Sequence, residues 1–137
     1  MIIGIGTDIV KIDRIKSAVF RHPNFINRFF DEQEIEYFNS RNLAPESIAG
    51  RFAAKEAVSK ALGTGFNGFG FKDISIARNT SGKPIVILRG EAKFLAEKYG
   101  NYKIHLSISH EFDNAVAFAV MEVDKIENCQ CGDNEKY

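Results

Sequence analysis

The sequence predicts a single α+β domain in which one long helix packs on a small, mainly antiparallel sheet. Two observations indicate this class. Apolar residues recur with helical spacing through most of the first half, whereas two segments near the end, 103–109 and 115–123, alternate as strands do. The 137 residues suit one domain with its own core.

The first half is predicted to contain a strand followed by helices. The strand covers 2–9, and the helices cover 11–20, 24–29, 32–39 and 46–62. Asp31 and Glu34 have the spacing of a capping box at the start of the third helix. Pro45 lies where a first helical residue is tolerated.

The second half is predicted to contain mainly strands. Its predicted elements are a strand at 71–78, a turn at 80–84, a strand at 85–88 and a helix at 90–99 closed by Gly100. The last two strands, 103–109 and 115–123, are expected to form an antiparallel hairpin that turns around Asp113 and Asn114.

Composition and charge narrow the class of protein. The 18 basic and 18 acidic residues balance, so nothing global indicates nucleic acid or a lipid surface. We find neither an apolar run of membrane-spanning length nor a signal-peptide pattern, and we expect a cytoplasmic protein. Residues 1–123 are expected to form the domain and 124–137 a polar, flexible tail, in which Cys129 and Cys131 are expected to be free thiols.

The segment 51–65, RFAAKEAVSKALGTG, carries the most chemical information. On a helix, its alanines, Val58 and Leu62 fall on one half, whereas Glu56, Ser59 and Lys60 share a stripe with Gly63 on the other. This stripe is typical of a surface for phosphate and metal. The segment alone also fits an ordinary amphipathic helix with a Glu56–Lys60 surface pair.

A second acid lies in the N-terminal segment 1–10, MIIGIGTDIV. In a strand, Gly4, Gly6 and Asp8 face one way and Ile3, Ile5 and Thr7 the other, which leaves a lane almost free of side chains beside the Asp8 carboxylate. A ligand could lie along that lane. Asp8 could instead cap the following helix, and the two roles could partly coexist.

Taken together, GTDIVKIDRI near the start, RFAAKEAVSKALGTG in the middle and SISH at 107–110 resemble one family. The chain resembles the holo-acyl-carrier-protein synthases, the short type of 4′-phosphopantetheinyl transferase, from about residue 1 to residue 123. The resemblance implies the phosphopantetheinyl transferase fold. It also implies transfer of the phosphopantetheine arm of coenzyme A to a serine of an acyl carrier protein, with adenosine 3′,5′-bisphosphate as the other product, for fatty acid biosynthesis.

The resemblance also implies roles for the acids and for Lys60. Asp8 and Glu56 match the family's metal-binding positions, and carboxylates suit Mg²⁺, which completes its octahedron with phosphate oxygens and waters. Lys60 matches the position that contacts the transferring phosphate. Either Glu56 or a metal-bound water can take the proton from the incoming serine, and the sequence does not decide between them.

Further residues are assigned to coenzyme A. The glycines after the long helix end it and let backbone N–H groups approach phosphate oxygens. Arg51 could reach a phosphate or remain a surface arginine. The residues assigned to the coenzyme A pocket are Arg51, Ser59, Lys60, Gly63, Gly65, Lys83, Pro84 and His110.

Two kinds of macromolecular partner are expected. Lys11, Arg14 and Arg21 group on one face of the first helix, and we expect them to bind the acidic carrier protein, with Arg14 as the main contact; a solvated helix face is the alternative. The second partner is the chain itself. The resemblance implies a homotrimer with active sites at subunit interfaces, which would also bury Phe66, Phe69 and Phe71.

Two other functions remain open at this point. The same Asp8 and Glu56 would serve another Mg²⁺-dependent phosphotransferase or nucleotide hydrolase. In a non-enzymatic trimeric binding module, these carboxylates would be structural.

Overall fold

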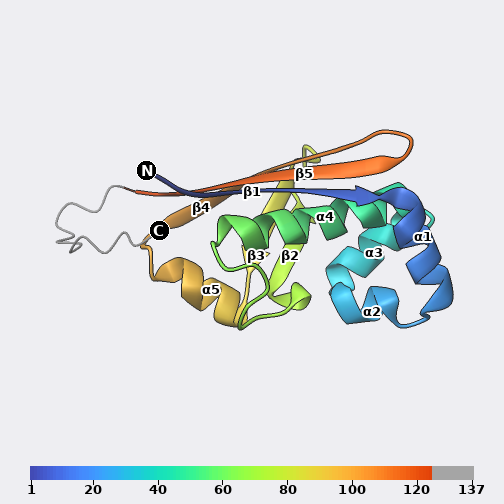
Figure 1. The fold of residues 1–137 in the computed structure, drawn as a ribbon, viewed down its shortest axis with the longest axis horizontal. Coiled ribbons are helices and arrows are strands. Elements are labelled where there is room, and N and C mark those ends of the chain that lie inside the picture. Colours follow the sequence, from blue (N-terminus) through green and yellow to red (C-terminus); the bar gives the residue numbers. More distant parts are fainter. Residues whose placement is uncertain (125–137) are drawn as a thin grey trace.

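The computed structural model describes residues 1–124, in which a three-stranded antiparallel sheet covers one long helix (Figure 1). Strands β1 (Ile2–Lys11), β5 (Asn114–Val123) and β4 (Tyr102–His110) pair in the order β1-β5-β4. Helix α4 (Pro45–Ala61) runs along the inner face of this sheet. The predicted class and the predicted final hairpin are confirmed.

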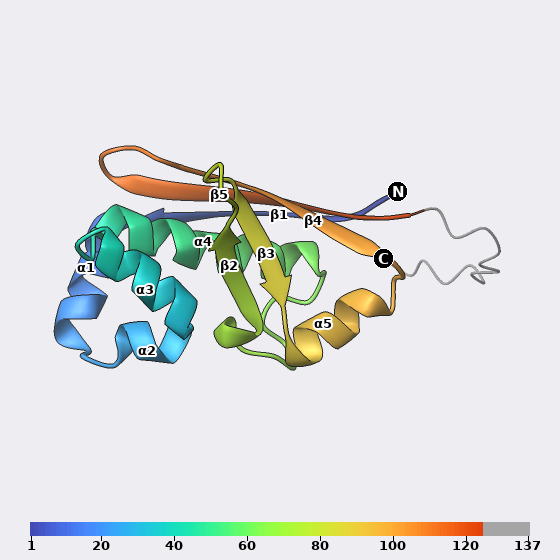
Figure 2. The same ribbon diagram turned by 180° about the vertical axis from the view of Figure 1, so that it is seen from behind.

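The remaining elements lie on the α4 side of the sheet. Helices α1 (Ile12–Arg21), α2 (Phe25–Phe29) and α3 (Glu32–Ser40) gather at one end of the molecule. Strands β2 (Ile74–Arg78) and β3 (Pro84–Leu88) form a second sheet, and helix α5 (Gly90–Glu97) lies at the other end (Figure 2).

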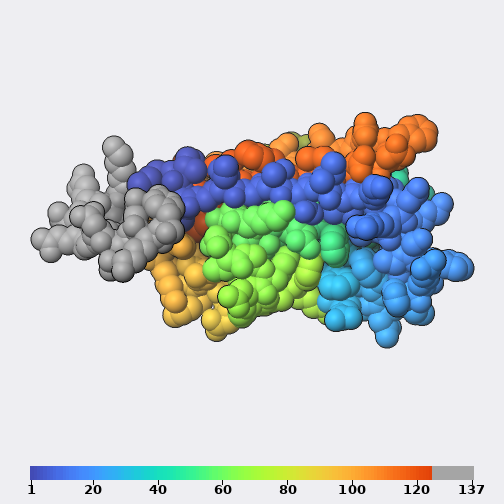
Figure 3. Space-filling view, in the orientation of Figure 1, coloured from blue at the N-terminus to red at the C-terminus, as the bar shows by residue number. Residues whose placement is uncertain are grey.

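Small residues let the long helix approach the sheet closely. On β5, the inward positions Ala115, Ala117 and Ala119 are fully buried, and they face a helix whose own Ala53 and Ala57 are fully buried. Alanine side chains keep two backbones close, so a shift of the helix would move every residue that it carries. Figure 3 shows β1 lying directly along α4.

A second apolar cluster holds the three short helices together. Phe30 and Phe38 meet edge to face at 4.8 Å, and Ile12 and Ile15 of α1 pack into the same cluster. Asp31 and Glu34 form the predicted capping box at the start of α3.

Most boundaries differ from the prediction by one or two residues, and three of the differences change a turn or a helix end. Residues Phe71–Asp73 form a 3₁₀ turn, η1, and not the start of a strand, because the Asp73 carboxylate accepts the N–H of Gly70 and closes the turn. Helix α5 ends at Glu97, two residues early. The last hairpin turns at 111–113, so Asn114 already belongs to β5.

The predicted tail falls almost entirely outside the described residues, and Cys129 and Cys131 lie there. Within residues 1–124, no helix combines the length and the apolar character needed to cross a bilayer.

Candidate active site

Asp8, Lys60 and Glu56 lie together where β1 runs alongside α4. The Lys60 ammonium donates to the backbone carbonyl of Thr7 at 2.9 Å and lies 3.3 Å from Asp8 Oδ1. The Asp8 side chain is 19% exposed, and Glu56 is half-buried one helical turn before Lys60. Two carboxylates and one ammonium therefore share a site that solvent reaches.

Two glycines of β1 create this meeting point. A Cβ added at Gly4 would lie 1.9 Å from the Ala61 carbonyl oxygen, and one added at Gly6 would lie 1.9 Å from the Ala57 carbonyl oxygen. Each step of two strand residues thus matches about one turn of α4, so the next inward residue, Asp8, lies beside the turn that carries Glu56. The glycine lane is therefore filled by helix backbone, and the expectation that a ligand lies along it was wrong.

The two carboxylates affect each other electrostatically. Partial burial and the charge of Asp8 raise the pKa of Glu56, and Lys60 offsets part of this rise. A cation between the carboxylates would remove their repulsion. Residues 1–124 hold no cluster of three or more His, Cys, Asp or Glu that could hold a metal ion. Two carboxylates are nevertheless a sufficient protein contribution for Mg²⁺, which takes its other ligands from substrate phosphates and water.

Three alternatives from the sequence are corrected here. Asp8 does not cap a helix, because β1 continues to Lys11 and α1 begins after it. Lys60 pairs with Asp8, and among the described residues no ion pair joins it to Glu56. Ser59 is buried and donates its hydroxyl to the Glu56 carbonyl oxygen at 2.6 Å, so it does not share the open stripe.

Arg51 lies in a separate cavity. Its guanidinium stacks 3.7 Å from the centre of the Tyr37 ring, and the residue is only 6% exposed, which excludes the surface-arginine alternative. Its Nε is buried without a hydrogen-bond partner among the described residues. A cavity of about 200 Å³ opens here, lined by Tyr37, Arg51, Arg78, Gly82, Pro84 and Ile108.

This cavity has the charge of an anion site. Arg78 also lies over the Tyr37 ring, at 5.0 Å. Burial lowers the pKa of Arg51, and the neighbouring charge of Arg78 adds to this effect. An anion would relieve both costs and would supply an acceptor for the unpaired Nε.

The other residues assigned to coenzyme A lie in three places. Gly63 and Gly65 follow α4 in an exposed segment and have φ angles of +90° and +60°, which favour glycine. Lys83 is exposed in the β2–β3 turn, beside the Arg51 cavity. His110 lies apart from that cavity, at the end of β4, where it lines a different hollow together with Glu111 and Asn114.

The two charged sites lie at opposite edges of the sheet. Asp8 belongs to edge strand β1, whereas Ile108 in the wall of the Arg51 cavity belongs to edge strand β4, with β5 between them. On α4, the five residues from Arg51 to Glu56 correspond to a rotation of about 140° around the helix axis. The structure therefore does not bring Arg51 and the carboxylates to one site within one copy of the chain.

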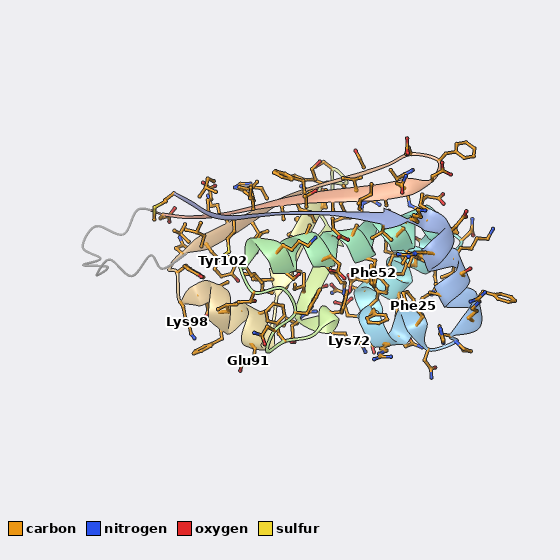
Figure 4. All side chains as sticks on the ribbon, in the orientation of Figure 1. Phe25, Phe52, Lys72, Glu91, Lys98 and Tyr102 are labelled. Carbon is orange, nitrogen blue, oxygen red and sulfur yellow. The ribbon has the colours of Figure 1, made fainter. Side chains whose placement is uncertain are left out.

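Basic side chains lie beside a larger apolar hollow at the α1 end. Lys11, Arg14 and Arg21 are all exposed. Lys11 and Arg14 border a cavity of about 600 Å³, whose floor includes Phe25 and Phe52. These two rings stack at 6.0 Å and are labelled in Figure 4.

Comparison with known proteins identifies the family. A family model described as the 4′-phosphopantetheinyl transferase superfamily matches residues 4–120. The chain belongs to this superfamily. It is 64% identical to the holo-[acyl-carrier-protein] synthase of Clostridium kluyveri over 133 residues, which cover 97% of this chain and 99% of the relative.

Solved structures of other superfamily members have the same fold. The holo-[acyl-carrier-protein] synthase of Neisseria meningitidis has a TM-score of 0.82 and 37% identity, over 90% of this chain and 100% of its own. A holo-(acyl-carrier-protein) synthase of Bacillus anthracis in complex with CoA (3′,5′-ADP) has a TM-score of 0.75 and 38% identity, over 90% and 99% of the two chains.

Two groups of polar residues in this superfamily member were not predicted. One is the pair Tyr37 and Arg78 in the Arg51 cavity. The other is a fully buried ion pair in which Lys55 Nζ lies 2.7 Å from Glu34 Oε1. Burial raises the pKa of Glu34 and lowers the pKa of Lys55, and the charge of each opposes the shift of the other. The only sequence signal for this pair was a lysine within an alanine-rich helix.

Proposed function

We propose that this protein transfers the 4′-phosphopantetheine arm of coenzyme A to a serine of apo acyl carrier protein and releases adenosine 3′,5′-bisphosphate. One observation carries the proposal: in a member of this superfamily, folding brings Asp8 and Glu56 together beside Lys60. The names of the relatives and the coenzyme A complex of the Bacillus anthracis protein support the same activity.

Asp8 and Glu56 are the residues that would hold Mg²⁺. Both offer hard oxygen ligands, and their mutual repulsion favours a cation between them. When bound, the ion supplies charge neutralisation for the pyrophosphate of coenzyme A.

The chain's own groups supply the other requirements of the reaction. The serine hydroxyl gives its proton to Glu56 or to a water, and its oxygen bonds to the phosphorus that carries the pantetheine arm. The bond from this phosphorus to the bridging oxygen breaks at the same time, and adenosine 3′,5′-bisphosphate leaves with that oxygen. Lys60, on the same helix face as Glu56, is positioned to offset the charge that develops on the transferring phosphate. Backbone N–H groups of the segment after Gly63 are suited to bind phosphate oxygens, and the basic face of α1 is suited to dock an acidic carrier.

We further propose that residues 1–123 form the transferase domain and that the active enzyme is a homotrimer with shared sites. The outer face of the sheet exposes large apolar residues, including Ile5 at 63%, Ile9 at 64% and Phe118 at 45%. Such a face is suited to burial against further copies. In one copy, a coenzyme A molecule that reached both Asp8 and the Arg51 cavity would have to pass around the sheet, whereas a neighbouring copy could supply the second site.

Subunit mixing tests the shared site. With coenzyme A kept well below the KM of the Arg51→Met variant, Asp8→Ala and Arg51→Met chains are each expected to show almost no activity alone. When the two chains are mixed in equal amounts and assemble at random, about one quarter of all sites would combine an intact Asp8 with an intact Arg51 from the next copy, so about a quarter of the activity should return. Mixed trimers without activity would contradict the shared site.

The transfer itself is tested by mass spectrometry. Apo carrier protein is incubated with this protein, coenzyme A and Mg²⁺, and its mass should rise by the phosphopantetheine arm. A carrier whose serine is replaced by alanine is the control. If the mass of the carrier stays unchanged after incubation with folded enzyme, coenzyme A and Mg²⁺, the proposed function is refuted.

A further inference from the structure

The buried Lys55 ammonium uses all three of its protons on three different segments. It donates to the carbonyl oxygen of Phe29 at 2.8 Å, to Glu34 Oε1 at 2.7 Å and to the carbonyl oxygen of Phe71 at 3.0 Å. An ammonium has three donors, so its hydrogen-bonding capacity is filled. Phe29 ends α2, Glu34 lies in α3, and Phe71 begins η1 directly after the glycine-rich segment 63–70.

Two of these segments lead to the two proposed substrate sites. Helix α2 carries Phe25, which lines the hollow beside Arg14. The segment 63–70 leaves α4 just after Lys60 and carries Gly63 and Gly65. Lys55 is therefore hydrogen-bonded to the carrier side and to the coenzyme A side of the molecule, and it precedes Glu56 in the chain.

Aromatic rings around Lys55 connect the same segments. Phe52 stacks on Phe71 at 5.1 Å, and Phe29 meets Phe71 edge to face at 4.8 Å. Phe66, in the glycine-rich segment, stacks on Phe71 at 4.0 Å. In Figure 4, Phe52 on α4 lies near Phe25 on α2.

The Phe66 and Phe69 rings pack on the core, but the glycines of the segment leave its backbone conformationally free, so directional bonds at its two ends matter. Gly63, Gly65 and Gly68 have positive φ, and a Cβ added at any of them would meet nothing within 4 Å in the described part of the chain. Its near end is held by the Gly65 N–H, which donates to the Ser59 carbonyl oxygen at 3.1 Å. Its far end is held by Lys55 at Phe71. Buried ion pairs are often replaceable by apolar residues without loss of stability, so stability alone does not require this arrangement.

We propose that Lys55 is a positioning residue that fixes both substrate-binding segments, the end of α2 and the glycine-rich segment, relative to Glu56. This inference rests on the proposed function for its kinetic consequence. Its structural consequence is independent of the reaction: Lys55 should keep residues 26–30 and 63–71 conformationally ordered.

The test compares the wild type with the double variant Lys55→Met/Glu34→Leu, which removes both charges and keeps apolar bulk. We expect it to fold with lowered stability, because Glu34 also accepts the N–H groups of Asp31 and Ile76, and to lose at least tenfold in kcat/KM for both coenzyme A and carrier. Hydrogen exchange should accelerate at residues 26–30 and 63–71 and stay unchanged in β4 and β5. Lys93→Met is the matched control, because it removes an exposed lysine that lies 3.8 Å from Glu97.

Wild-type kcat/KM and wild-type exchange in a folded double variant would overturn the proposal. If the double variant does not fold, the unmodified protein still decides: addition of adenosine 3′,5′-bisphosphate should slow exchange at 63–71 and at 26–30 together. Slowing confined to 63–71 would overturn it. If the wild type transfers no phosphopantetheine, the proposed function is wrong, but the hydrogen-exchange results still decide whether Lys55 positions the two segments.

Discussion

Replacement of Gly6 by alanine tests how closely β1 must approach α4. The new methyl group would lie 1.9 Å from the Ala57 carbonyl oxygen and 2.9 Å from the Ala61 nitrogen, and both contacts are to backbone. No side-chain rotation relieves them, so β1 and α4 must separate by about 1 Å at this point. Asp8 is two residues further along β1, and it must move with the strand.

The expected losses follow from this shift. Overpacking of this kind lowers the free energy of unfolding by about 1–3 kcal/mol. A displacement of about 1 Å between catalytic groups lowers kcat on the order of 100-fold. Both are measured on one preparation, by urea unfolding and by steady-state transfer to carrier protein.

Gly70→Ala is the control for stability. Gly70 has a φ of −110°, and a Cβ there would meet nothing within 4 Å among residues 1–124. Its free energy of unfolding should stay the same or rise slightly. If Gly6→Ala has the free energy of unfolding and the kcat of the wild type, the close approach of β1 to α4 does not position Asp8, and the reasoning is refuted.

Three further predictions concern single charges. Arg14→Glu should raise the KM for carrier protein and flatten its dependence on salt, measured between low and physiological ionic strength; an unchanged salt dependence would remove Arg14 from the docking surface. Arg51→Met should raise the KM for coenzyme A by about 10- to 100-fold, the value of a charge-assisted hydrogen bond, and should affect the KM for carrier much less; equal effects on both would contradict the anion site. Asp31→Asn should lower the free energy of unfolding at pH 7 by about 1.5 kcal/mol. Partial burial opposes the charge of Asp31, but hydrogen bonds from Ser75, the Glu34 N–H and Arg89 outweigh it and lower its pKa. This stabilisation is therefore complete above the unfolded pKa and is lost as the pH falls through the lower folded pKa, so the variant should show a shallower loss of stability in acid. If the free energies of unfolding of the variant and the wild type, measured by urea unfolding, fall equally steeply as the pH is lowered, this explanation is contradicted.

The parts of the site that depend on local periodicity were predictable. Strand alternation places Gly4, Gly6 and Asp8 on one face, and helical spacing places Glu56 and Lys60 on one stripe; both follow from positions only a few residues apart. The family resemblance then joined the two segments. The resemblance was needed to place the two segments in one site, because the periodicity of β1 does not indicate which helix packs against this strand.

The parts that depend on distant contacts were not predictable. Gly4 and Gly6 indicate a strand face without side chains, but the sequence does not tell whether a ligand or another backbone covers that face. In the structure it is covered by the backbone of α4, some fifty residues later in the chain. Lys55 and Glu34 form their pair across 21 residues and two helices. Periodicity marks apolar positions as buried, whereas a buried charge is recognisable only once its partner is known.

Asp8 and Glu56 are proposed to hold one divalent cation together with coenzyme A. The most direct measurement is calorimetric titration of Mg²⁺ into the protein saturated with coenzyme A, for the wild type, Asp8→Asn and Glu56→Gln. We predict one cation per active site in the wild type and at least tenfold weaker binding in each variant. Wild-type Mg²⁺ affinity in both variants would contradict the claim.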